Sequence, residues 1–100
     1  MAGDDSSFEL EEATEVSEPP LFTVIMHNDH YTTMDFVVEV LELVFLKTPS
    51  EATQIMLAIH RRGQGLCGSF TREVAESKID RVHSLARQNE FPLRCSMEEA

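Results

Sequence analysis

The sequence predicts a small α+β domain, in which three helices pack on a small three-stranded sheet. The expected order is strand, helix, helix, strand, helix, strand, preceded by a disordered N-terminal tail. Two observations support this fold class. Short stretches rich in β-branched and aromatic residues alternate with stretches whose apolar residues recur at helical spacing. A chain of 100 residues, 42% of them hydrophobic, has room for one core of this kind and not for two.

The first twenty residues differ from the rest of the chain. They contain seven acidic side chains and no Lys or Arg, and they end in Pro19 and Pro20. This composition is typical of a disordered chain, which either solubilises a protein or offers an interaction site. We therefore expect residues 1–20 to be a disordered acidic extension and residues 21–100 to form the folded domain.

The first strand and the first helix follow this extension. Residues 22–27 are rich in β-forming side chains and end at the turn-forming pair Asn28 and Asp29. Thr32 is expected to cap the next helix, with Asp35 as its capping-box partner three residues later. The apolar residues of this helix recur at helical spacing: Phe36, Val37, Val40, Leu41 and Val44.

A capping box also opens the second helix. It is formed by Thr48 and Glu51, with Pro49 at the first helical position, and the helix ends at Gly63. Pro92 prevents the last helix from continuing into the final strand. The remaining elements are a strand over residues 65–70, a helix capped by Thr71, and a strand over residues 93–97.

Composition excludes several classes of function. A net charge of −10 is unfavourable for binding nucleic acid or an anionic membrane surface. No stretch approaches the roughly 18 apolar residues of a membrane span, and no signal-peptide pattern is present, so we expect a cytoplasmic protein. We also expect it to be a monomer. The spacing of Cys67, Cys95 and the four histidines fits no metal site, and no cofactor-binding motif occurs.

No group of residues points to an enzyme. Cys67 lies in a predicted strand, where a free cysteine is usually a small buried side chain. Its pairing with His60 as nucleophile and base is a weak alternative. There is no G-x-S-x-G motif and no signature of paired catalytic carboxylates. We therefore expect a binding protein without catalytic residues.

The loop between the first strand and the first helix is the most informative feature. Residues 27–33 are polar and lie between two structured elements, as binding loops often do. The helices that follow carry Met34 and Met56, whose flexible side chains form adaptable apolar walls. From the pattern alone, the simpler interpretation is favoured, namely core methionines and an ordinary turn at Asn28 and Asp29.

A resemblance to the ClpS family is carried by residues 22–37, which read Phe-Thr-Val-Ile-Met-His-Asn-Asp-His-Tyr-Thr-Thr-Met-Asp-Phe-Val. The family's pattern there is a strand followed by Asn-Asp-Asp-Tyr-Thr-Pro-Met-Glu-Phe-Val. Several dense motifs in the same order, with unbroken spacing, form a specific signal. The resemblance covers essentially all of residues 21–100, through further matches at residues 52–60, 63, 67–68, 70–78 and 92–95.

ClpS proteins are adaptors that select N-end-rule substrates for the ClpA or ClpC unfoldase and the ClpP protease. The resemblance implies that this chain holds the first residue of a substrate, usually Leu, Phe, Tyr or Trp. Such a residue, called an N-degron, is bound by its α-amino group and its side chain. The resemblance implies Asn28, Asp29 and His60 as the residues that bind the α-amino group. It implies an apolar pocket formed by Thr32, Met34, Val37, Met56, Ile59 and Leu93.

Three further positions matter by the same resemblance. Glu73 and Lys78 match family positions that dock on the N-terminal domain of a ClpA-type AAA+ unfoldase, although a solvated helix face also explains them. His30 stands where the family has a second Asp, so a negative charge is missing beside the α-amino site. This substitution suggests altered or narrowed specificity. The alternative is that the chain is a peptide- or protein-binding module of the same fold that has lost N-degron recognition.

Overall fold

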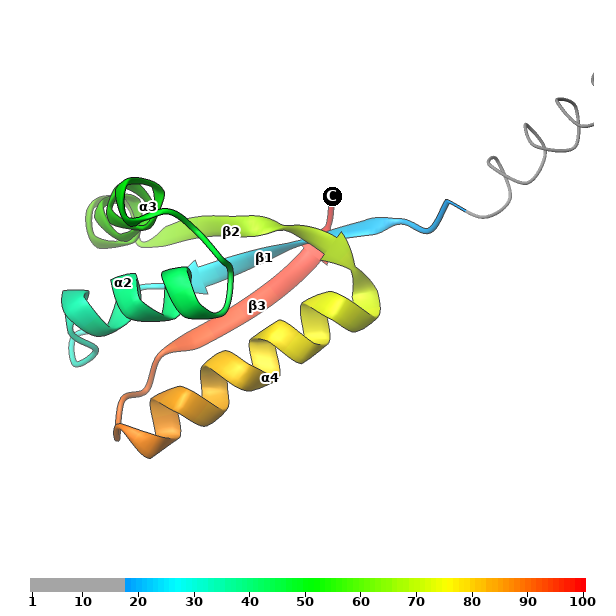
Figure 1. The fold of residues 1–100 in the computed structure, drawn as a ribbon. Helices are drawn as coiled ribbons and strands as arrows, with labels where there is room; N and C mark the ends of the chain where they lie inside the picture. Colours follow the sequence, from blue (N-terminus) through cyan, green and yellow to red (C-terminus); the bar gives the residue numbers. More distant parts are fainter. Residues whose placement is uncertain (1–17) are drawn as a thin grey trace, which may run out of the picture.

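The computed structural model describes residues 18–100 of the chain. Its elements, shown in Figure 1, are β1 (Leu21–His27), α2 (Met34–Leu43), α3 (Pro49–Arg62), β2 (Gln64–Thr71), α4 (Arg72–Gln88) and β3 (Arg94–Glu99). The predicted α+β class and the order of elements are confirmed. The prediction of a disordered acidic extension falls mainly on residues 1–17, which lie outside the described part.

The sheet is antiparallel, with β1 in the centre of the order β2-β1-β3. The register places His27, at the end of β1, between Gln64 of β2 and Arg94 of β3. The loop after β1 therefore leaves the sheet where β2 and β3 begin. Alternate side chains of β1 are buried in the core: Phe22, Val24 and Met26.

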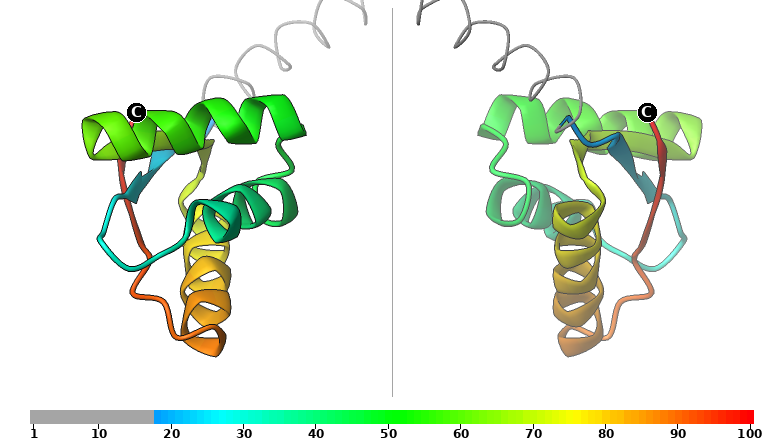
Figure 2. Two further views of the ribbon diagram at one scale, coloured as in Figure 1. Left: turned by 90° about the vertical axis from the view of Figure 1, so that its left-hand side faces the viewer. Right: turned by 90° about the vertical axis from the view of Figure 1, so that its right-hand side faces the viewer.

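The helices cover one side and one edge of this sheet. Figure 2 shows α2 and α4 on the same side of the strands, with α3 crossing over β2. Gly65 of β2 allows α3 to come close, because an added Cβ would lie 2.7 Å from Cγ1 of Ile59 and 3.1 Å from Cγ2 of Ile55. This close approach positions the end of α3 beside the loop that follows β1.

The helix caps confirm one expectation and correct another. In α3, the Thr48 hydroxyl accepts the N–H of Glu51 at 3.2 Å, and the Glu51 carboxylate accepts the N–H of Thr48 at 2.9 Å, as predicted. The predicted cap of α2 at Thr32 is wrong. Thr33 is the N-cap, and its hydroxyl accepts the N–H of Phe36 at 3.2 Å. Thr32 instead bonds within the preceding loop.

Candidate functional site

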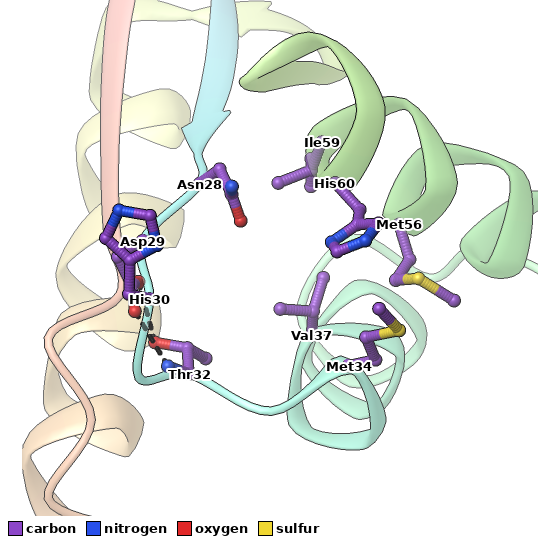
Figure 3. Close-up of a pocket in the computed structure, with 9 residues that line it drawn as sticks. All are labelled: Asn28, Asp29, His30, Thr32, Met34, Val37, Met56, Ile59 and His60. Carbon is purple, nitrogen blue, oxygen red and sulfur yellow. Dashed lines mark hydrogen bonds between the residues drawn. The ribbon is translucent and has the colours of Figure 1, made fainter.

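A pocket of about 240 Å³ opens where the loop after β1 meets α2 and α3. Three separate segments of the chain therefore contribute to one site, and each lining residue is one that the family resemblance implies. Figure 3 shows the nine residues: Asn28, Asp29, His30 and Thr32 from the loop, Met34 and Val37 from α2, and Met56, Ile59 and His60 from α3.

The Asp29 carboxylate organises the loop of residues 28–33, which we call the recognition loop. Its Oδ1 accepts the backbone N–H of Tyr31 at 2.8 Å and that of Thr32 at 2.7 Å. Its Oδ2 accepts the Thr32 hydroxyl at 2.7 Å. An Asp side chain that bonds the backbone two and three residues later closes a turn. Because a carboxylate has about four acceptor sites, Asp29 keeps capacity for a further donor.

These bonds also set the charge of Asp29. Burial alone would raise the pKa of this carboxyl. The hydrogen bonds from Thr32 and Tyr31 outweigh burial and, with a smaller contribution from the nearby His30, lower the pKa below its ordinary value of 3.8. The recognition loop therefore presents a fixed negative charge at neutral pH.

Backbone hydrogen bonds join the recognition loop to the end of α3. The N–H of Asn28 donates to the carbonyl of Gly63 at 2.9 Å, and the N–H of Gly63 donates to the carbonyl of Ile59 at 2.9 Å. Gly63 ends α3 with φ at 92°, a left-handed conformation that glycine adopts without steric cost. This link holds Asn28 opposite His60. The sequence indicated Gly63 only as the end of a helix.

The pocket has apolar walls and a polar rim. Val37 and Ile59 are buried, whereas Met34 is 45% exposed and lies at the outer edge of the pocket. The side chains of Asn28 and His60 point into the opening in Figure 3, and the hydrogen bonds drawn there join Asp29 and Thr32. An apolar cavity of about 150 Å³ accepts benzene. The pocket therefore has room for a large hydrophobic side chain, with hydrogen-bonding groups at its mouth.

Comparison with known proteins identifies the family. A family model described as ATP-dependent Clp protease adaptor protein ClpS matches residues 17–96. The chain belongs to the ClpS family. It is therefore an adaptor of the Clp protease, acting in protein degradation, and not an enzyme, as the sequence indicated.

Close relatives of this ClpS-family chain carry the same description. An ATP-dependent Clp protease adapter protein ClpS from Syntrophus aciditrophicus (strain SB) is 55% identical over 95 residues, which cover 95% of this chain and 89% of the relative. One from Nitratidesulfovibrio vulgaris (strain DSM 19637 / Miyazaki F) is 54% identical over 97 residues, covering 97% and 95%.

A solved structure of the family has the same fold. It is Agrobacterium tumefaciens ClpS2 bound to L-phenylalaninamide, with a TM-score of 0.80 and 31% sequence identity. The match covers 83% of this chain and 100% of that chain.

In residues 18–100 of the present protein, no group of three or more His, Cys, Asp or Glu side chains could hold a metal ion. None of the helices described combines the length and apolar character that a membrane crossing requires.

Leu93, which the family motif implies for the pocket, and Glu73, which it implies for docking on the unfoldase, both lie away from the pocket. Leu93 is 4% exposed, belongs to the core, and borders a separate groove beside α4 instead of lining the pocket. Glu73 is exposed in the first turn of α4.

Lys78 of α4 has a structural role. Its Nζ donates to the carbonyl of Val44, at the end of α2, at 2.8 Å. The same ammonium lies 5.8 Å from the ring centroid of Phe45 and 5.2 Å from that of Phe70. A cation at this place is favourable for the C-terminal end of a helix and for the faces of aromatic rings. Lys78 therefore connects α4 to α2 and is not the freely solvated residue that the sequence pattern alone indicates.

His27, next to the recognition loop, makes the stability of the domain depend on pH. Its Nε2 lies 2.6 Å from Oγ of Ser96. Burial, and then the charge of Arg94, lower its pKa from the ordinary value of 6.5. Below that value the unfolded chain binds more protons than the folded one. The His27 contribution to stability is therefore complete above pH 6.5 and is lost as the pH falls through the folded-state pKa.

We expect the urea midpoint of unfolding to decrease between about pH 7 and pH 5. The His27→Gln variant should show a smaller decrease, because Gln keeps a polar group near Ser96 and does not titrate. The measurement is urea denaturation of both proteins across this range. The same decrease in both would contradict the assignment to His27.

Proposed function

We propose that this ClpS-family adaptor binds the first residue of N-degron substrates in the pocket and delivers them, in the cytoplasm, to a ClpA-type AAA+ unfoldase for degradation by ClpP. The supporting observation is the pocket itself. Its apolar walls are bordered by polar groups from both the recognition loop and α3. In this proposal the chain acts as a monomer and needs no cofactor.

The chemistry of a free N-terminus suits this rim. An α-amino group has a pKa of about 7.7–8.0, so at neutral pH it is mostly an ammonium with three donors. The Asn28 carbonyl, Oδ2 of Asp29 and the unprotonated nitrogen of His60 are suitable acceptors. Each hydrogen bond to a charged group contributes roughly 1.5–3 kcal/mol. Burying a Leu or Phe side chain adds about the same. One anchored residue can therefore reach micromolar affinity, about −8 kcal/mol, after ordering costs.

The apolar walls suit large side chains without branching at Cβ. In this proposal Met34, Val37, Met56 and Ile59 surround the side chain of an N-terminal Leu, Phe, Tyr or Trp, with Thr32 beside them. Val and Ile are excluded where Met34 and Ile59 limit the space beside the substrate Cβ. L-phenylalaninamide, the ligand of the related ClpS2 structure, has a free α-amino group and an aromatic side chain, which supports this ligand class.

The test of the proposal is fluorescence anisotropy with Leu- and Phe-initiated peptides that have either a free or an acetylated N-terminus. Acetylation removes the charge and adds bulk, so we expect at least a roughly 30-fold loss of affinity, about 2 kcal/mol. A peptide of the same composition that begins with Glu is the control and should bind weakly. Equal binding of free and acetylated peptides would favour the alternative, a general peptide-binding module of this fold.

Delivery requires docking on the unfoldase, for which we propose Glu73 and Lys78 of α4. Glu73 is exposed and free to contact a partner. The Lys78 ammonium already donates to the Val44 carbonyl, and the side chain is half-buried, so only the exposed part of this side chain can contact the unfoldase. Glu73 is therefore the more accessible of the two groups.

The acidic extension supplies a separate prediction about delivery. Deleting residues 1–20 should leave peptide affinity within about twofold, because no pocket residue is removed. It should abolish degradation of an N-degron reporter by the unfoldase and protease. Replacing residues 1–20 with a Gly/Ser linker of equal length is the matched control, which shows whether delivery depends on the acidic side chains or only on the length of the extension. Undiminished degradation after deletion would leave the extension only a solubilising role.

His30 is the proposed determinant of altered specificity. Its side chain is exposed and lines the pocket beside Asp29. We expect His30→Asp to strengthen N-degron binding by a few-fold, since exposed charge pairs contribute roughly 0.2–1 kcal/mol. The ranking of Leu, Phe, Tyr and Trp peptides should become less steep. His30→Asn, which adds no charge, is the control. Unchanged affinity and ranking in His30→Asp would show that His30 does not affect specificity.

A further inference from the structure

A second groove, of about 280 Å³, lies between the end of α4 and the start of β3. No acidic residue lines it, although the chain as a whole has a net charge of −10. Two of its residues are arginines, and most of the others are apolar. We call it the basic groove, and its main residues are His83, Arg87, Phe91, Pro92, Leu93 and Arg94.

The basic groove combines an apolar floor with a cationic rim. Arg87 lies in the last turn of α4 and Arg94 begins β3, and both are exposed. The Phe91 ring is fixed against Phe36, with centroids 4.9 Å apart. His83 uses Nε2 to accept the N–H of Cys95 at 3.0 Å, so that nitrogen is already bonded within the domain. The chemistry that fits is a peptide with carboxylates next to apolar side chains.

We propose that the basic groove binds the acidic N-terminal segment of the same chain, residues 4–15. This segment reads Asp-Asp-Ser-Ser-Phe-Glu-Leu-Glu-Glu-Ala-Thr-Glu and has six carboxylates and no basic residue. In an extended chain, Phe8 and Leu10 point to the same side and can contact the floor. The carboxylates of Glu9 and Glu11 then point to the opposite side, away from the floor, where the long exposed side chains of Arg87 and Arg94 can reach them.

The segment is long enough to reach the basic groove. The chain enters β1 at Leu21, whereas Arg94 pairs with His27 at the other end of that strand. The six residue steps of β1 correspond to roughly 20 Å at about 3.3 Å each. The thirteen residue steps from Phe8 to Leu21 can span up to about 43 Å when extended. Phe8 can therefore reach the floor of the groove.

The charges along β3 favour the groove over the end of the sheet where the chain enters. Glu98 and Glu99 pair with Thr23 and Phe22 near the start of β1, so they repel an acidic segment there, and Arg72 over the Phe22 ring offsets part of this repulsion. Arg94 attracts it at the opposite end. Because the segment is part of the same chain, its effective concentration is in the millimolar range for a short linker. Weak contacts are therefore sufficient to populate the bound form.

The test measures paramagnetic relaxation in the full-length protein with a nitroxide on Ser7→Cys. Cys67 and Cys95 are buried, so the reagent labels the introduced thiol selectively. We expect the amide signals of the basic groove, represented by Arg87, Phe91 and Arg94, to broaden at least about threefold more than those of Glu98 and Glu99. Salt at about 0.5 M should reduce this broadening, because ions screen the exposed charge pairs.

Two controls test whether the broadening arises from the arginines of the groove and from the same chain: charge variants, and a mixture of isotope-labelled with spin-labelled chains. Arg87→Gln/Arg94→Gln should lose the selective broadening, whereas Arg61→Gln/Arg62→Gln, which removes the same charge from α3, should keep it. Uniform broadening, or selective broadening that persists in Arg87→Gln/Arg94→Gln, would overturn the proposal. So would broadening of an isotope-labelled chain by a separate spin-labelled chain, which would assign the groove to a second copy. Peptide binding is not measured, so the result is independent of the proposed adaptor function.

Discussion

The Asp29→Ala variant should lose at least about 30-fold in affinity for an N-degron peptide and should also be less stable. Ala removes the three hydrogen bonds that Asp29 accepts from Tyr31 and Thr32. It also removes a carboxylate from the place where we propose that the α-amino group binds. Hydrogen bonds to charged groups contribute roughly 1.5–3 kcal/mol each when shielded and less when exposed, so we expect a destabilisation of about 1–3 kcal/mol.

The Asp29→Asn variant separates loop geometry from charge. Its Oδ1 can still accept the two backbone N–H groups, and its amide can donate to the Thr32 hydroxyl. We expect stability close to wild type and an affinity between those of wild type and Asp29→Ala. Because the pKa of Asp29 is lowered from 3.8, its stabilising effect is present above that pH and is lost as the pH falls through the lowered pKa. Wild-type affinity in a folded Asp29→Ala protein would contradict the assigned role.

The His60→Ala variant should bind N-degron peptides at least about tenfold more weakly, a loss of roughly 1.4 kcal/mol, without unfolding the domain. His60 lies in the last turn of α3, is exposed, and turns its imidazole into the pocket in Figure 3. Its neutral ring can accept a hydrogen bond from the substrate ammonium, which Ala cannot do. Anisotropy titrations measure the affinity, and urea denaturation confirms the fold.

A neighbouring residue provides the matched control for His60. Arg61 lies in the same last turn and is exposed, but it does not line the pocket. Arg61→Ala should therefore keep wild-type affinity. If Arg61→Ala weakens binding as much as His60→Ala does, the effect arises from the general charge of α3 and not from an acceptor at His60.

The sequence predicts those elements whose signals are local. The capping box at Thr48 and Glu51 is such a case, because both partners lie within four residues of each other. The predicted ends of the strands are less accurate. The second strand begins at Gln64 and ends at Thr71, one residue beyond the prediction at each end, and the third strand is Arg94–Glu99 instead of residues 93–97. Strand ends depend on pairing with β1, which the local sequence does not encode.

The cap of α2 shows how one local hydrogen-bonding pattern excludes another. Thr32 and Thr33 are equivalent as caps by composition. The Asp29 carboxylate binds both the N–H and the hydroxyl of Thr32, which leaves Thr33 as the N-cap. Thr71 occupies the predicted N-cap of α4, but its side chain makes no capping hydrogen bond.

The nine residues that line the pocket are among those that the family motif implies, and their binding roles stay predictions. Pattern alone favoured an ordinary core and turn, and only the family motif singled out the residues that line the pocket. The bond from Asn28 to the Gly63 carbonyl joins residues 35 positions apart, and no local signal indicates it. Leu93 and Lys78 have contacts that the family motif does not indicate. Leu93 is buried in the core, and the Lys78 ammonium donates to the carbonyl of Val44. The docking role of Lys78 stays a prediction.

Recognition of the α-amino group can be tested with a ligand that lacks only that group. A Leu-initiated peptide is compared with its analogue in which a 4-methylpentanoyl group replaces the Leu residue, so that the side chain is kept and the amine is lost. Affinities are measured for wild type and His60→Ala, which together form a double-mutant cycle. We expect loss of the amine to cost wild type at least about 30-fold and His60→Ala clearly less, with a coupling of at least about 1 kcal/mol. An equal loss in both proteins, or no loss in wild type, would contradict binding of the α-amino group by His60 in this pocket.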